Sequence, residues 1–156
     1  MRTASVKEIK TELEHLPQDE LVKLCLRLIK FKKETKELAG YLLFDAHNEQ
    51  EYTEQVKEML DDLFAEVNTR NLYITKKNLR KIVRIAGKYI KYSDEKTTEI
   101  ELLIFVCKRM QKLKIDYKKS VQLQNLYAAQ VKKINKAISV LHEDLQYDYL
   151  KEIDEL

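Results

Sequence analysis

The stretch that decides the fold is residues 95–113, EKTTEIELLIFVCKRMQKL. Its apolar residues run from Ile100 to Cys107, are interrupted only by Glu101, and surround nearly the whole circumference of a helix. A helix that is apolar on all sides is covered by its neighbours. The run is also far shorter than the ~20 residues that cross a bilayer, so it predicts a core helix and not a membrane span.

Composition points to helices in the rest of the chain. The 156 residues include only two glycines and one proline, whereas sheet proteins use such residues at their many turns. Leu, Ile, Lys and Glu are abundant and favour helices. A chain of this length favours one domain, here residues 1–156. The predicted fold class is therefore all-α, an irregular bundle or short α-solenoid of about six to seven helices.

Local signals place the helix boundaries. Ser5 and Glu8 form a capping box, and Asn48 and Thr75 are candidate N-caps of later helices. The helix at 18–31 is apolar on most sides, as is the one at 95–113, so both are expected to be central. The predicted helices span about residues 6–13, 18–31, 34–44, 49–68, 76–92 and 95–113, the third being either separate or a kinked extension of the second.

From Ser120 onward, apolar residues recur at alternating steps of four and three, the pattern of a seam between paired helices. The seam lasts under three heptads, which favours an antiparallel neighbour within the chain over a dimeric coiled coil. We therefore expect a monomer. The seam residues are Tyr127, Val131, Ile134, Ile138, Leu141 and Leu145.

The two cysteines indicate a reducing compartment. Cys25 and Cys107 each lie within apolar runs, as core cysteines of cytosolic proteins do. The first residues lack the pattern of a secretory signal. We therefore expect a cytoplasmic protein that does not enter a membrane.

Charge is segregated along the chain. Residues 45–68 contain eight acidic residues and one lysine, whereas residues 69–92 contain eight basic residues and no acidic one. Five of the basic residues recur at steps of four and three, so they share one face of the predicted helix. This basic stripe consists of Lys77, Lys81, Arg84, Lys88 and Lys91.

Two interpretations of the basic stripe are open. Together with nearby tyrosines, its cations have the chemistry for phosphate contacts and base stacking in a nucleic-acid complex, with Lys76 and Arg80 beside them. Alternatively, the helices at 49–68 and 76–92 form a hairpin whose acidic and basic flanks pair with each other. The net charge of only +3 favours the pairing interpretation.

The sequence contains no motif that predicts catalysis or a cofactor. His15, His47 and His142 are isolated from one another and from the cysteines, so no metal-ligand spacing occurs. The glycines are too few for a phosphate-binding loop or a nucleophile elbow. We therefore predict no catalytic residue, no metal, no cofactor and no enzymatic activity.

Three runs carry a resemblance to known proteins: residues 24–34, 88–93 and 99–103. Together they resemble small all-helical proteins of the Bacteroidetes bacteria, over about the first two thirds of the chain. That family has no assigned activity, so the resemblance implies a helical fold and a bacterial source but no functional residue. The function predicted from the residues is a non-enzymatic helical module that binds another protein, with the basic stripe as its candidate surface. The alternative is a nucleic-acid-binding protein that uses the same stripe.

Overall fold

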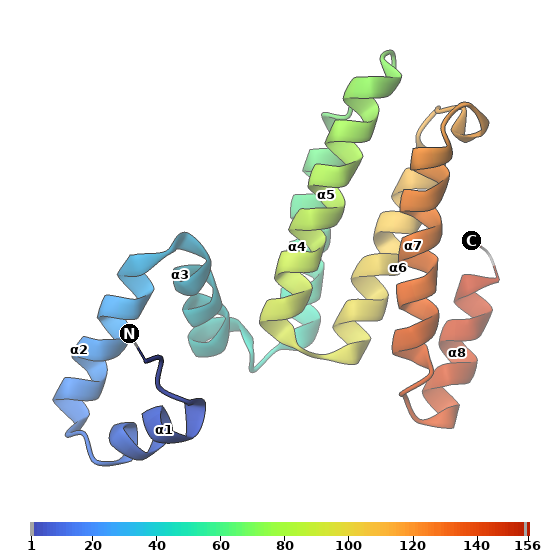
Figure 1. Cartoon of the computed structure of the whole chain (residues 1–156). Helices are drawn as coiled ribbons and strands as arrows, with labels where there is room; N and C mark the ends of the chain where they lie inside the picture. Colours follow the sequence, from blue (N-terminus) through green and yellow to red (C-terminus); the bar gives the residue numbers. More distant parts are fainter. Residues whose placement is uncertain (1, 155) are drawn as a thin grey trace. The chain divides into compact units, whose positions relative to one another are not determined.

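The computed structural model describes residues 2–154 and 156, and all its regular elements are helical (Figure 1). The all-α prediction is confirmed, with eight α-helices in the described residues instead of six to seven. A π-helical turn, Tyr41–Asp45, follows α3, and a short 3-10 turn, Tyr117–Lys119, precedes α7. The α-helices are α1 (Val6–Glu14), α2 (Gln18–Phe31), α3 (Lys33–Gly40), α4 (Glu49–Ala65), α5 (Leu72–Ser93), α6 (Lys96–Lys112), α7 (Val121–Ile138) and α8 (Glu143–Ile153).

Two of the three predicted N-caps are formed as the sequence predicts. The Ser5–Glu8 capping box is formed, and the Asn48 side chain accepts a hydrogen bond from the Glu51 amide at 3.3 Å. The predicted cap at Thr75 is wrong. Asn71 Oδ1 accepts from two backbone amides instead, while the Thr75 hydroxyl donates back to the Asn71 carbonyl at 2.9 Å. Asparagine satisfies the free amides of a first turn better than threonine, so α5 begins four residues earlier than predicted.

The contacts within the chain define two compact units, Met1–Phe44 and Asp45–Leu156. The N-terminal unit contains α1, α2 and α3, and the C-terminal unit contains α4 to α8. A single domain over residues 1–156 stays a prediction.

The core of the C-terminal unit forms around α6, as predicted. This helix packs against α4, α5 and α7 and is buried over most of its circumference, whereas Glu101, Phe105 and Lys108 on the remaining face are half-buried. Ile134 and Ile138 of α7 pack on it, so α7 has the intramolecular neighbour that its seam predicted. The buried residues of α6 are Thr98, Ile100, Leu102, Leu103, Ile104, Val106, Cys107 and Met110.

The predicted seam does not continue through one helix to Leu145. α7 ends at Ile138, where the Ser139 hydroxyl donates to the Lys136 carbonyl at 2.8 Å. His142 then adopts an extended conformation and caps α8 by accepting from the Asp144 amide at 3.4 Å. Serine and histidine side chains thus satisfy backbone groups that a continuous helix would have used.

The N-terminal unit differs most from expectation. The prediction that the helix at 18–31 is central is wrong, because none of its residues is buried. Cys25 is exposed, which corrects its assignment to the core, whereas Cys107 is buried as predicted. Among residues 2–44 only Tyr41 is buried. The two other short helices of this unit, α1 and α3, offer too little apolar surface to enclose α2, although its sequence is apolar on most sides.

The half-buried Tyr117 of the C-terminal unit predicts a loss of stability at alkaline pH. The Tyr117 hydroxyl donates to the Met110 carbonyl at 2.5 Å, and burial raises the pKa of Tyr117 to about 12. The unfolded chain ionises this phenol near pH 10, whereas the folded chain keeps it neutral. The stabilisation is therefore fully present below about pH 10 and is lost as the pH rises through about 12.

Tyr117→Phe should consequently flatten the dependence of the melting temperature on pH between about 9.5 and 11.5, by several degrees relative to wild type. Circular dichroism at a series of pH values measures this. Tyr147→Phe is the matched control, because Tyr147 is 61% exposed. Equal slopes for wild type and Tyr117→Phe would contradict the prediction.

Candidate functional site

The basic stripe lies on the outer face of α5. This helix turns Leu79, Ile82 and Ala86 into the core, which leaves the opposite face to solvent. Lys77, Lys81, Arg84 and Lys91 are exposed and Lys88 is half-buried. The amphipathic pattern of α5 therefore holds all five cations on one ridge.

A hollow of about 710 Å³ lies between the first half of α5 and the start of α7. Five cations line it and no carboxylate does. Gln122 of α7 accepts hydrogen bonds from Lys76 Nζ at 3.0 Å and from Arg80 Nη2 at 3.5 Å. Tyr73, also in the lining, is 73% exposed. The full lining is Tyr73, Lys76, Lys77, Arg80, Lys81, Arg84 and Gln122.

A second hollow, of about 440 Å³, lies further along α5 and α7, and α6 also lines it. It is lined by four lysines and one carboxylate, Glu99, which lies 2.8 Å from Lys96. Gln130 is also in its lining. Its Nε2 donates to the Leu126 carbonyl at 2.9 Å, while its buried Oε1 accepts no hydrogen bond within the described residues. The lysines are Lys91, Lys96, Lys133 and Lys136.

The two hollows together form a surface that we call the α5/α7 groove. Both are lined by α5 and α7, and these helices start at the same end of the C-terminal unit (Figure 1). Arg84 lines the first hollow and its neighbour Val83 lines the second, so one follows the other along α5. The groove therefore carries nine cations and one carboxylate.

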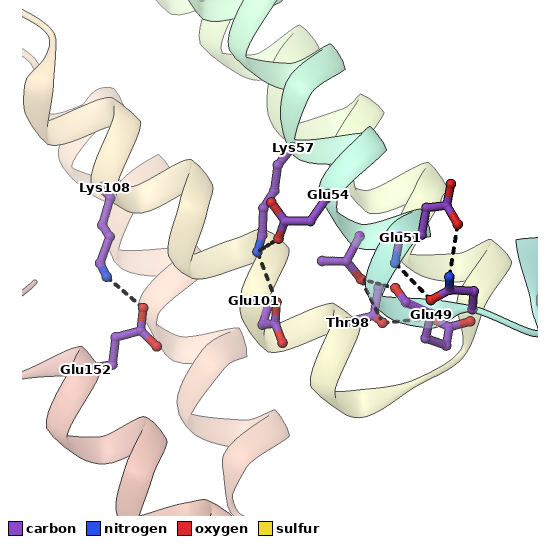
Figure 2. A network of polar contacts seen from close by, with 10 residues as sticks. Glu49, Glu51, Glu54, Lys57, Thr98, Glu101, Lys108 and Glu152 are labelled. Carbon is purple, nitrogen blue, oxygen red and sulfur yellow. Dashed lines mark hydrogen bonds and ion pairs between the residues drawn. The ribbon is translucent and has the colours of Figure 1, made fainter.

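The acidic residues of α4 are largely engaged elsewhere. Lys57, in α4 itself, lies 2.7 Å from Glu54 and 3.0 Å from Glu101 of α6 (Figure 2). Burial lowers the pKa of Lys57, but hydrogen bonds and the charges of these two carboxylates outweigh burial and raise it. Asp61 Oδ1 lies 2.5 Å from Arg109 Nε of α6, in ionic contact without hydrogen-bond alignment.

A second cluster of hydrogen bonds occupies the start of α4. Glu49 Oε2 accepts hydrogen bonds from the hydroxyls of Thr98 and Ser93, both at 2.8 Å. Figure 2 shows Glu49 and Thr98 side by side where α4 and α6 meet. These bonds fix α4 on the core and leave the α5/α7 groove untouched.

The pairing interpretation of the basic stripe is wrong for four of its five members. Lys77, Lys81, Arg84 and Lys91 form no ion pair with any carboxylate of the described residues. Lys88 behaves differently, because its Nζ lies 4.7 Å from the ring centre of Tyr89 and 5.9 Å from that of Tyr92. Lys88 lines neither hollow.

Sequence reasoning missed the contribution of other helices to the groove. Lys133 and Lys136 are one turn apart in α7, so their spacing indicates that they share a face. Only the apolar seam of that helix was predicted from its sequence. Gln122 gives no such signal, because its role depends on the packing of α7 beside α5. Lys96 likewise reaches the groove only through the turn between α5 and α6.

The remaining chemistry of the chain is sparse. Within residues 2–154 and 156, no three His, Cys, Asp or Glu side chains lie close enough together to hold a metal ion. Burial raises the pKa of the Cys107 thiol to about 12, which makes it a poor nucleophile at neutral pH. None of the described helices is both long and apolar enough to span a membrane.

Comparison of the chain with known protein families, with curated proteins and with solved structures finds no match. The resemblance to helical proteins of Bacteroidetes therefore stays a prediction.

Proposed function

We propose that this chain is a non-enzymatic binding protein that holds a nucleic acid in the α5/α7 groove. The observation that supports this proposal is the lining of the groove, nine cations and one carboxylate, in which four stripe cations form no ion pair with the part of the chain that the structure describes. Local charge governs such binding, because interactions beyond about 10 Å are screened at physiological salt. A net charge of +3 is therefore compatible with a strongly positive groove.

The groove also offers contacts that are suited to bases. Tyr73 exposes its ring beside the five cations of the first hollow, and base stacking on an aromatic ring contributes about 1–3 kcal/mol. Gln130 Oε1 can accept a hydrogen bond from a bound group in the second hollow. Stacking requires an unpaired base, so a single strand is the preferred ligand.

An acidic protein is the second candidate, because carboxylates would use the same cations. It would leave the exposed Tyr73 ring without a stacking partner, which is why we rank it below nucleic acid. Either ligand suits our further proposal that the protein acts in the cytoplasm, where the exposed free thiol of Cys25 would remain reduced.

The test is a titration of the full chain against a fluorescein-labelled single-stranded oligonucleotide, read by anisotropy at 50–300 mM KCl. If the five cations of the first hollow contact phosphates, log K should fall against log salt with a slope of about −3 to −4. Poly-glutamate of similar length serves as competitor. Absence of binding at 50 mM KCl would overturn the proposal, and displacement by poly-glutamate at equal charge would favour the acidic protein.

A further inference from the structure

The N-terminal unit leaves an apolar stripe of α2 uncovered. Val22 and Leu26 are 51% and 48% exposed, Cys25 is exposed, and Ile29 is half-buried. These residues follow steps of three and four, so they form one stripe along about two turns. A unit of about 44 residues seldom folds stably without added stabilisation, and this one has a single buried side chain among residues 2–44.

The two edges of this stripe differ in character. One edge carries Asp19 near the start of α2 and Lys30 near its end, at positions that align along the helix. The other edge carries the apolar residues Leu21 and Leu28. Lys23 lies on the charged edge and pairs within the helix with Glu20 at 2.8 Å and with Asp19 at 3.8 Å, exposed contacts that contribute little.

This asymmetry decides how two copies of α2 would pair. In a parallel pair, the charged edge of each helix would adjoin the apolar edge of the other. In an antiparallel pair like edges adjoin, so Asp19 of one copy meets Lys30 of the other, and the leucine edges meet each other. Val22 then faces Ile29 of the second copy, and Cys25 lies near the two-fold axis.

We propose that α2 is a self-association surface, and that the chain forms a symmetric dimer through antiparallel pairing of α2 with α2 of a second copy. This proposal differs from the expectation of a monomer, which rested on the short seam of residues 127–145 and did not concern α2. None of the residues involved lies in the α5/α7 groove, so the dimer and nucleic-acid binding can fail independently of each other.

The first test is the molar mass of the full chain, measured by sedimentation velocity from about 1 to 100 µM. We expect a dimer at the upper concentrations and a monomer for Val22→Ser/Leu26→Ser, whose helical content by circular dichroism should remain that of wild type. A wild-type chain that stays monomeric throughout would overturn the proposal. So would a dimer that persists unchanged in the double variant.

A charge exchange tests the orientation. Asp19→Lys should weaken the dimer at least about tenfold, and adding Lys30→Asp should restore it, because the pair is re-formed with the signs reversed. Arg27→Glu is the matched control, since it reverses an exposed charge on the opposite face of α2 and should leave the dimer unchanged. Failure of the second substitution to restore association would contradict antiparallel pairing.

Cysteine crosslinking gives an independent readout. Cys25 is exposed and Cys107 is buried, so a short bismaleimide should react at Cys25 and join two copies near the axis. Crosslinked dimer is expected from wild type and should be absent from Cys25→Ser. Wild type that yields only singly modified monomer at 100 µM would overturn the proposed arrangement.

Discussion

Reversing three charges in the first hollow, with Lys77→Glu, Lys81→Glu and Arg84→Glu, is expected to weaken oligonucleotide binding on the order of 100-fold at 50 mM KCl. The three side chains are exposed and form no ion pair in the described residues, so their substitution disrupts no contact with a carboxylate. Each lost phosphate contact costs about 1 kcal/mol, and 1.4 kcal/mol is tenfold. The slope of log K against log salt should become shallower by about 2.

The matched control makes the same change of net charge in the N-terminal unit. Lys7→Glu, Lys10→Glu and Lys36→Glu alter exposed residues outside the α5/α7 groove and should leave affinity within about threefold of wild type. Equal losses in both triple variants would mean that binding follows net charge alone. A groove variant that binds like wild type would contradict the proposed site.

Ile134→Ala is expected to lower the free energy of unfolding by about 3 kcal/mol, the middle of the range for such truncations in a core. Ile134 is fully buried and packs with Ile100 and Ile104 of α6, so the lost methyl groups leave a cavity between the two helices. Urea unfolding followed by circular dichroism measures the change.

Val121→Ala is the comparison within the same helix. Val121 is 67% exposed at the start of α7, so its truncation should change stability by less than about 0.5 kcal/mol. Similar losses for the two variants would show that α7 does not form the core that its contacts with α6 indicate.

The core of the C-terminal unit could be predicted from sequence because its signals are local and agree with one another. The apolar residues of α6 occupy most of its circumference and are buried in the structure, and the seam positions Ile134 and Ile138 do face that helix. The Ser5 and Asn48 caps were equally predictable, since a cap depends on residues within one turn.

The same logic failed for α2, whose sequence is also apolar on most sides. An apolar pattern predicts which faces of a helix are apolar but not which elements cover them. In the structure, α1 and α3 do not cover the apolar faces of α2. The location of Cys25 was wrong for the same reason.

Of the candidate site, the contribution of α5 could be predicted from the sequence, but that of α7 could not. The helical period of 3.6 residues places the basic residues of α5 on one face, so Lys77, Lys81, Arg84 and Lys91 could be grouped from their spacing. The environment of Lys88 beside two tyrosines, and the walls supplied by α7, depend on packing between distant segments that no spacing encodes.

The parallel course of α5 and α7 makes the groove unequal from end to end. Tyr73 and Gln122 are the second residues of their helices, so the first turns of both helices line the same hollow. The backbone amides of a first turn carry a partial positive charge that adds to that of nearby cations. No residue of α6, whose opposite end would contribute negative charge, lines this hollow. The positive potential is therefore graded along the groove, highest beside Tyr73 and lower toward Lys136, so the phosphates of a bound strand would be held most tightly at the end where α5 and α7 begin.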